Sequence, residues 1–130
     1  MNIPTELLYS KDHEWCRVEG DVATIGITDF AQGELGDVVF LELPDADAAT
    51  TAGGEFGTIE AVKAVAELFA PVSGTVIEVN QEVVDAPEII NEDPYGAGWM
   101  IKVKLDDKAE LDNLLDAAGY KELIGEGGGD

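Results

Sequence analysis

Apolar and polar positions alternate along the first half of the chain, and this pattern predicts β-strands. Residues 15–18 and 22–27 form two apolar-rich runs, which are separated by Glu19-Gly20-Asp21. Because glycine adopts backbone conformations that other residues avoid, the turn at Gly20 indicates a hairpin. Residues 37–43 form a further strand. Pro44 ends it, because proline cannot donate a hydrogen bond to a neighbouring strand.

The middle of the chain repeats the strand pattern with more frequent turns. A polar loop over residues 45–54 comes first. A strand through Phe56, Thr58 and Glu60 follows, and a second strand run begins at Leu68. The turn residues Pro71, Ser73 and Gly74 then precede a strand over residues 75–80. We expect segments 57–60 and 74–79 to be paired strands on either side of Lys63. Many short strands with frequent turns predict a β sandwich or barrel.

Helical patterns are few and short. Thr28 is a suitable N-cap for a helix over residues 29–35, which Gly36 would terminate. Pro87, Pro94 and Gly96 mark an irregular stretch, and a half-buried strand then follows through residues 99–105. Near the C-terminus, apolar residues at helical spacing predict a helix whose start Asp106 or Asp107 could cap; they are Leu111, Leu114, Leu115 and Ala118.

Length and composition predict a single domain. The chain has 130 residues, of which 45% are hydrophobic, enough for one buried core. We assign the domain to residues 1–124 and interpret the glycine-rich residues 125–130 as a flexible tail. No apolar run approaches the ~20 residues of a membrane helix. The N-terminal residues 1–10 lack a basic region followed by an apolar stretch, so we expect a cytoplasmic protein.

The large excess of acidic over basic residues restricts which molecules the protein can bind. Asp and Glu number 28 against 7 Lys and Arg, which gives a formal net charge of −21. Such a chain repels nucleic acid and anionic membranes, so we expect neither as a partner. Acidic residues spread along the whole chain also repel one another unless salt screens them. We therefore predict a halophilic protein from a high-salt cytoplasm; an ordinary acidic carrier would normally hold more lysine.

The residue types needed for catalysis or metal binding are scarce. His13 is the only histidine and Cys16 the only cysteine, so neither a zinc site nor a disulfide is expected. Cys16 is interpreted as a buried strand residue. No serine or cysteine lies in a nucleophile-elbow pattern, and no phosphate-binding loop is present. The many carboxylates leave a glycosidase-like acid pair open by count, but we favour solvated surface charge and therefore predict no catalytic residues and no metal.

Lys63 is the most isolated of the six lysines. Four others, Lys102, Lys104, Lys108 and Lys121, lie toward the C-terminus. The immediate neighbours of Lys63 are small or apolar, and the nearest charges are Glu60 and Glu67. A lysine amine on a flexible stem is a common acceptor for acylation, and at a turn it would be open to a modifying enzyme. From chemistry alone, an ordinary solubilising lysine on a loop is the favoured interpretation.

A resemblance to a known family favours modification. Residues 56–64 with the core Glu60-Ala61-Val62-Lys63-Ala64, followed by residues 70–76, resemble the lipoyl-attachment region of glycine cleavage H proteins. Further matching blocks are His13-Glu14-Trp15, residues 24–29, Ala31-Gln32, Leu35-Gly36-Asp37, residues 41–44, and the stretch from Val79-Asn80 through residues 91–95 to Gly98-Trp99-Met100. The resemblance covers residues from about 9 to 123, nearly the whole chain.

The resemblance implies a fold and a function. The fold is the lipoyl- or biotinyl-carrier type of flattened barrel, a barrel-sandwich hybrid of two small antiparallel sheets with a few peripheral helices, including a C-terminal one. Lipoate would be joined to Lys63 by an amide and would carry an aminomethyl group between enzymes. The implied partners are the pyridoxal-phosphate glycine decarboxylase, the tetrahydrofolate-dependent aminomethyltransferase, the FAD-dependent dihydrolipoyl dehydrogenase and lipoate-attaching enzymes. The carrier itself is expected to be a monomer.

The family also shelters its loaded arm in a cleft on its own surface. Glu14 aligns with a cleft residue of the family and Glu67 with an acidic one, and a carboxylate there could pair with the cationic amine. The usual Ser-Asp pair before Leu68 is Ala66-Glu67 in this chain, which weakens the assignment of Glu67. Surface charge is the alternative interpretation of both residues.

Other carriers fit the sequence less well. Biotin carriers flank their lysine with methionines, whereas Val62 and Ala64 flank Lys63, and lipoyl domains of 2-oxoacid dehydrogenases usually have Asp before the lysine. An H-like protein that relays lipoyl groups to other complexes stays open as an alternative function, because its sequence would look the same.

Overall fold

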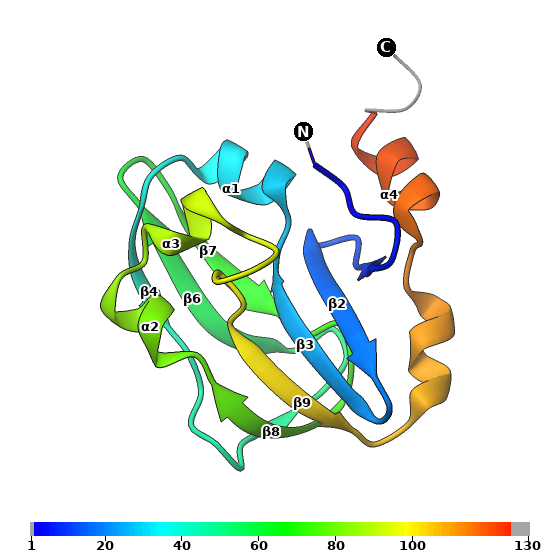
Figure 1. Cartoon of the computed structure of the whole chain (residues 1–130). Coiled ribbons are helices and arrows are strands. Elements are labelled where there is room, and N and C mark those ends of the chain that lie inside the picture. Colours follow the sequence, from blue (N-terminus) through cyan, green and yellow to red (C-terminus); the bar gives the residue numbers. More distant parts are fainter. Residues whose placement is uncertain (1, 126–130) are drawn as a thin grey trace.

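The computed structural model describes residues 2–125, and within them nine strands form two antiparallel sheets (Figure 1). The larger sheet has the strand order β1-β2-β3-β9-β8-β5 and the smaller one β4-β6-β7. The strands are β1 (Leu8–Tyr9), β2 (Glu14–Glu19), β3 (Val22–Ile27), β4 (Val38–Glu42), β5 (Ala49–Thr50), β6 (Glu55–Ala61), β7 (Val65–Phe69), β8 (Gly74–Val79) and β9 (Ile101–Leu105). The mainly β architecture expected from the sequence is confirmed.

Short helices surround the sheets. They are α1 (Asp29–Leu35), α2 (Gln81–Asp85), α3 (Ile89–Glu92), the 3-10 helix η1 (Lys108–Asn113) and α4 (Ala117–Ile124). The prediction for α1 is confirmed, because the Thr28 side chain accepts a hydrogen bond from the Ala31 N–H at 3.2 Å. Gly36 closes the helix with φ of +80°, a conformation that glycine adopts without strain. None of the helices in residues 2–125 is long and apolar enough to cross a membrane.

The predicted β2–β3 hairpin is also confirmed. Strands β2 and β3 pair from Glu14 opposite Ile27 to Glu19 opposite Val22, and Gly20 in the turn has φ of +65°. Cys16 lies opposite Ile25 and is buried, as expected. This register places Glu14 at the start of β2, close to where α1 begins.

The predicted pairing of residues 57–60 with residues 74–79 is wrong. Strand β6 pairs with β7 across the turn at Lys63, with Glu60 opposite Val65 and Thr58 opposite Glu67. Strand β8 pairs instead with β9 and β5 in the other sheet. Because a tight turn connects β6 to β7, pairing these two strands closes only a short loop and costs less conformational entropy than pairing β6 with β8. Beyond Pro71 the chain crosses to the larger sheet.

The predicted C-terminal helix is confirmed as α4, but the helical pattern expected over residues 111–118 is not one continuous helix. Its apolar positions fall on two elements, because η1 ends at Asn113 and α4 begins only at Ala117. Between them, Leu115 makes a pair of backbone hydrogen bonds with Tyr9, at 2.7 and 2.8 Å. Asp107 caps η1 through the Ala109 N–H, as predicted for a helix here, and Asp116 caps α4 through the Gly119 N–H. The predicted irregular stretch holds α3; the tail beyond Gly125 lies outside the described residues.

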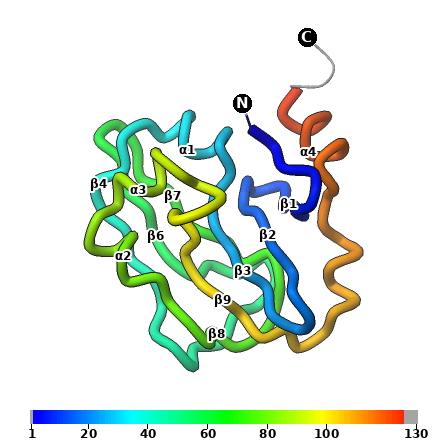
Figure 2. The backbone as a smooth tube through the Cα atoms, viewed as in Figure 1, coloured from blue at the N-terminus to red at the C-terminus, as the bar shows by residue number. Residues whose placement is uncertain are grey.

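Two hydrophobic clusters hold the fold together. The main cluster joins the two sheets and contains buried residues such as Ile25, Leu41, Ile59 and Val103. Burying each such side chain contributes about 1.5–3 kcal/mol. The second cluster joins the N-terminal segment to α4, which run side by side in Figure 2, and its Tyr9 and Tyr120 rings stack at 4.8 Å. Trp15, which follows Glu14, belongs to the second cluster, and Cys16 belongs to the main one. The start of β2 is therefore fixed by both clusters.

Candidate functional site

Lys63 lies at the exposed tip of the β6–β7 hairpin. The turn is closed by a backbone hydrogen bond of 2.7 Å from the Ala61 N–H to the Ala64 carbonyl. Val62 beside it is 76% exposed, an unusual position for a large apolar side chain. The structure thus places the lysine where a large modifying enzyme could reach its amine.

The three residues that follow α1, Gly36–Asp37–Val38, contact this tip and are called the platform below. The Val62 N–H donates to the Asp37 carbonyl at 3.0 Å, and Val38 pairs with Ala61. A Cβ atom placed on Gly36 would lie 3.2 Å from Cε of Lys63, so the lysine stem rests against the glycine backbone. Both the positive φ and this close approach favour glycine at position 36.

Among residues 2–125, no carboxylate forms an ion pair with the ammonium group of Lys63. Two salt bridges occur in residues 2–125, Lys102 with Glu78 and Lys104 with Asp21, each at 3.8 Å and partly exposed. Both belong to the β3–β9–β8 sheet. Exposed pairs of this kind contribute little to stability. The amine at the tip is therefore available for chemistry rather than engaged in stabilising the fold.

A cleft of about 300 Å³ is lined by residues of α1 and of both strands of the Lys63 hairpin, although Lys63 itself does not line it. Leu35, which precedes Gly36, and Ala66, three residues beyond Lys63, both line it. Its apolar lining comes from Ile27, Phe30, Ala31, Leu35, Ile59, Ala66 and Leu68. Glu14 and Glu67, the two carboxylates singled out from the sequence, line the same cleft. The structure therefore brings both of them together within one space next to the hairpin.

Glu14 is almost completely buried, with only 2% of its surface exposed. Its two carboxyl oxygens accept hydrogen bonds from Ser10 Oγ at 2.6 Å and from the Phe69 N–H at 3.3 Å. Burial in this largely apolar space raises the pKa of the Glu14 carboxyl to about 8, although both hydrogen bonds act in the opposite direction. Glu14 therefore binds its proton near neutral pH until a cation approaches.

Glu67 approaches the cleft differently. It lies on β7, an edge strand of the smaller sheet, opposite Thr58, and its side chain is exposed. A carboxylate at this rim is hydrated and can move, whereas Glu14 is fixed at the base of β2. The two residues thus present one buried and one solvated acid to the same cavity.

Sequence reasoning missed three further polar residues of the cleft, namely Asp12, His13 and Glu34. His13 has φ of +70°, and its Nδ1 lies 2.8 Å from the Tyr120 hydroxyl. Its ring also contacts Phe30, with centroids 4.9 Å apart, and burial lowers the pKa of its imidazole. The left-handed turn at His13 is a tertiary feature, so no sequence pattern could have placed this ring in the cleft.

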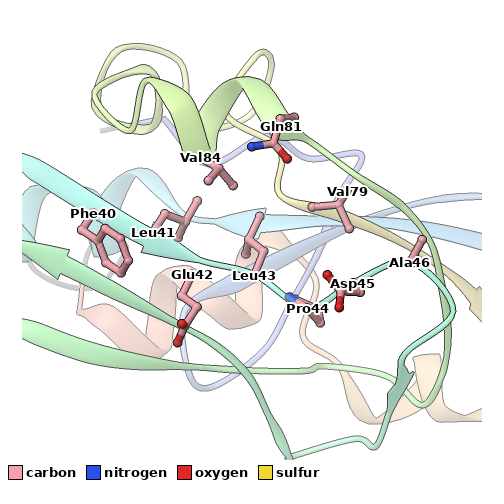
Figure 3. Close-up of a pocket in the computed structure, with 10 residues that line it drawn as sticks. All are labelled: Phe40, Leu41, Glu42, Leu43, Pro44, Asp45, Ala46, Val79, Gln81 and Val84. Atoms are coloured by element: carbon pink, nitrogen blue, oxygen red, sulfur yellow. The ribbon is translucent and has the colours of Figure 1, made fainter.

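A second hollow of about 520 Å³ lies between β4 and α2 (Figure 3). Leu41 and Leu43 point toward Val79 and Val84 there, whereas Phe40 and Glu42 point the other way. Its lining contains carboxylates but no histidine, cysteine, lysine or arginine. Within residues 2–125, no group of three or more His, Cys, Asp or Glu side chains could hold a metal ion. The chemistry of the described chain therefore centres on the Lys63 tip and its cleft.

Two small antiparallel sheets with an exposed lysine at a hairpin tip define a protein of the lipoyl- and biotinyl-carrier class. A family model described as "Glycine cleavage H-protein" matches residues 7–127. The glycine cleavage system H proteins of Staphylococcus carnosus and Staphylococcus haemolyticus are each 58% identical over 126 residues, which is 97% of this chain and all of theirs. The chain belongs to the glycine cleavage H-protein family.

A solved structure agrees with this assignment. The crystal structure of a glycine cleavage system H protein from Mycobacterium marinum is similar to this chain, with a TM-score of 0.86 and 39% identity. The similarity covers 95% of this chain and 99% of the Mycobacterium chain. The two-sheet arrangement described above is therefore the arrangement of a known H protein over nearly its whole length.

Proposed function

We propose that this chain is a lipoyl-carrying shuttle of glycine cleavage and that Lys63 is its attachment site. The observation that carries the proposal is an exposed lysine at the tip of a hairpin whose strands line an apolar cleft with a buried carboxyl group, in a chain of the H-protein family. A tether of this kind raises the effective concentration of its cargo at each partner enzyme. The chain itself is proposed to be non-catalytic.

The residues of the cleft fit a lipoyl arm. The aliphatic chain and dithiolane ring are apolar, and seven apolar residues, from Ile27 to Leu68, line the cleft that would receive them. A lysyl-lipoyl arm extends on the order of 10–15 Å, judged from ordinary bond lengths, which is enough to fold back from the tip. When bound, lipoate supplies a sulfur that carries the aminomethyl group and a disulfide that is reduced and later reoxidised.

The protein's part is to hold, orient and shelter this arm. Gly36 gives the stem of Lys63 a surface to lie against, and the hydrogen bond from Val62 to Asp37 fixes the tip from which the arm starts. Glu14 would pair with the cationic amine of the cargo at the base of the cleft, and Glu67 would attract it at the rim. Because burial favours the neutral form of Glu14, formation of the pair releases the carboxyl proton.

The proposed partners follow from the reaction. A glycine decarboxylase with pyridoxal phosphate loads the arm, an aminomethyltransferase with tetrahydrofolate unloads it, and a dihydrolipoyl dehydrogenase with FAD reoxidises it. A lipoate-attaching enzyme must act first, on Lys63. We propose that the carrier meets each of them as a monomer. The acidic surface of the carrier favours partners with a basic face around their active-site entrance.

A lysine substitution tests the attachment site. Lys63→Arg keeps the charge but removes the acyl acceptor, and an exposed tip position should change stability by less than about 0.5 kcal/mol. After incubation with a lipoate ligase, lipoate and ATP, intact mass and peptide mapping should find one lipoyl group on the wild type and none on Lys63→Arg. The variant should also accept no aminomethyl group from the decarboxylase.

Lys104→Arg is the matched control. Its lysine is exposed and lies on β9, far along the chain from the hairpin, so the variant should be lipoylated like the wild type. A lipoyl group that still appears on the Lys63→Arg protein would show that another lysine is the acceptor and would refute the assignment of Lys63.

A further inference from the structure

Asn91 occupies a position that the proposed function does not yet explain. It lies on α3, outside the cleft, and its side-chain amide makes three hydrogen bonds. Its Oδ1 accepts from the Val38 N–H at 2.9 Å, and its Nδ2 donates to the Gly36 carbonyl at 2.8 Å and to Gln32 Oε1 at 3.0 Å. One side chain thus connects α3 to the end of α1 and to the start of β4.

These bonds hold both ends of the Gly36–Asp37–Val38 platform. Between the two held residues, Asp37 offers its carbonyl to the Val62 N–H at 3.0 Å. Gly36 itself lies against the stem of Lys63. A short chain of direct contacts therefore runs from the amide of Asn91 through the platform to the lysine tip, although the Asn91 side chain bonds directly to neither Lys63 nor Val62 within the described residues.

The platform needs a residue with a donor and an acceptor on one rigid group. The Val38 N–H requires an acceptor and the Gly36 carbonyl a donor, a combination that the asparagine amide supplies and a carboxylate does not. Without the amide, two partly buried backbone groups would lose their partners, which costs about 1–3 kcal/mol for each. The segment would then settle into another conformation, and the hairpin tip bonded to it would move.

We propose that Asn91 is a positioning residue for the acylation of Lys63. It fixes the platform that sets the direction in which the lysine amine leaves the hairpin. The inference rests on the proposed function, since it assumes that a lipoate ligase acts on Lys63. In that reaction the Nζ lone pair attacks the carbonyl carbon of a lipoyl adenylate, the C–N bond forms, the bond to AMP breaks, and the amine proton passes to water.

The effect should be on the chemical step. Rates of such transfers depend steeply on alignment, and a shift of about 1 Å can cost up to ~10²-fold. The outer surface of the hairpin, which a ligase would contact, keeps its side chains when Asn91 is replaced. We therefore expect Asn91→Ala to lower kcat for lipoylation about tenfold while the KM for the carrier changes by less than about threefold.

Asn80 offers a matched control. Its side chain also makes three hydrogen bonds, with Ala97, Trp99 and Glu82, and Asn80 is the N-cap of α2. None of these partners belongs to the platform or the hairpin. Asn80→Ala should therefore lower the melting temperature to a similar degree as Asn91→Ala but leave lipoylation within about twofold of the wild type.

The experiment measures steady-state lipoylation of the full chain with a lipoate ligase, lipoate and ATP, together with hydrogen exchange at the backbone amides. In Asn91→Ala the Val62 amide, which donates to Asp37, should exchange at least about tenfold faster than in Asn80→Ala. Asn91→Asp keeps the side-chain volume and the acceptor for Val38 but sets an oxygen against the Gly36 carbonyl. It should show the same loss in kcat, and it carries the test if Asn91→Ala does not fold.

The outcomes separate this inference from the proposed function. Equal lipoylation rates for the Asn91 and Asn80 variants, or a loss confined to KM, would overturn the positioning role while leaving Lys63 as the acceptor. A wild-type chain that the ligase does not modify at Lys63 would overturn the proposed function, and the positioning role with it. A selective loss in kcat with faster exchange at Val62 supports both.

Discussion

Glu14 is the residue whose chemistry depends most on its surroundings. Its pKa of about 8 in the folded protein lies above the ordinary value of 4.5 that applies to the unfolded chain. Between these values the folded protein holds a proton that the unfolded chain has released. Unfolding then releases a proton, so the contribution of Glu14 to stability is fully present below about pH 4.5 and is lost as the pH rises through about 8.

Glu14→Gln should remove this pH dependence. Glutamine keeps an acceptor for the Phe69 N–H and a side chain of similar volume but does not titrate. We expect the free energy of unfolding of the wild type, relative to Glu14→Gln, to fall between about pH 5 and pH 9 by an amount on the order of a few kcal/mol. Urea melts across this pH range measure the difference.

Glu67→Gln is the control for this measurement. It removes an exposed carboxyl group from the same cleft, so its unfolding free energy should follow the wild-type pH dependence closely. A wild type and a Glu14→Gln variant with parallel pH curves would mean that Glu14 is already ionised in the folded protein.

The residues of the site were predictable from the sequence to different degrees. The exposed position of Lys63 could be predicted because a tight turn exposes the residue at its tip, and the motif around Lys63 made it the candidate attachment site. The burial of Glu14 could not be found, because it depends on Ser10 and Phe69, one of them far away in the sequence. Asn91 is similar: its partners are 53 to 59 residues away, and no local pattern reveals them.

At the scale of elements, two glycines near α1 allow a direct comparison. Gly33 lies inside the helix, and a Cβ there would meet nothing within 4 Å. Gly36 closes the helix at φ of +80° against the Lys63 stem. Alanine should therefore have opposite effects on stability at these two positions, although they are only three residues apart.

Gly33→Ala should raise the free energy of unfolding by about 0.5–1 kcal/mol, because alanine favours the helix and loses less entropy on folding. Gly36→Ala should lower it by about 1–3 kcal/mol, because the required backbone conformation is strained for alanine. Thermal and urea melts of both variants test this pair. A neutral or stabilising Gly36→Ala would show that the platform can adopt another conformation without cost.

Local signals predicted the elements well where the chain pairs with its near neighbours. The β2–β3 hairpin and α1 have their turn and cap residues in the sequence, and both form as expected. The C-terminal helix was misplaced because Leu115 pairs with Tyr9, more than a hundred residues earlier. Because of this long-range contact, the backbone at Leu115 is not helical, although the apolar residues around it are spaced as in a helix. Likewise, β8 pairs with β9, which also pairs with β3, so this pairing depends on contacts between distant segments that no local pattern reveals.

At the scale of the molecule, the dominant feature is a formal net charge of −21 on 130 residues. Only two salt bridges form within residues 2–125, so few of the acidic side chains in this range are neutralised by a neighbouring cation. The core meanwhile joins both sheets and is largely apolar. The folded state is thus a balance between apolar burial and repulsion among surface carboxylates, and added salt acts on both.

We predict that the melting temperature rises steadily as sodium or potassium chloride increases to molar levels. At ~0.1 M salt the Debye length is about 10 Å, so neighbouring carboxylates still repel one another, and at ~1 M it falls to about 3 Å. Ions that are excluded from the surface further strengthen apolar burial. Thermal melts across a chloride series measure the slope; a melting temperature that is flat or falls between low and molar salt contradicts the high-salt interpretation.

A variant with fewer surface charges separates repulsion from the general effect of salt. Glu19, Glu88 and Asp106 are exposed acids without a side-chain hydrogen bond or ion pair to another described residue. Replacing them with Gln, Gln and Asn should raise the melting temperature at low salt and reduce its slope against chloride, because part of the repulsion is gone. At molar salt the variant and the wild type should melt within about 1–2 °C of each other, since screening removes the difference between them.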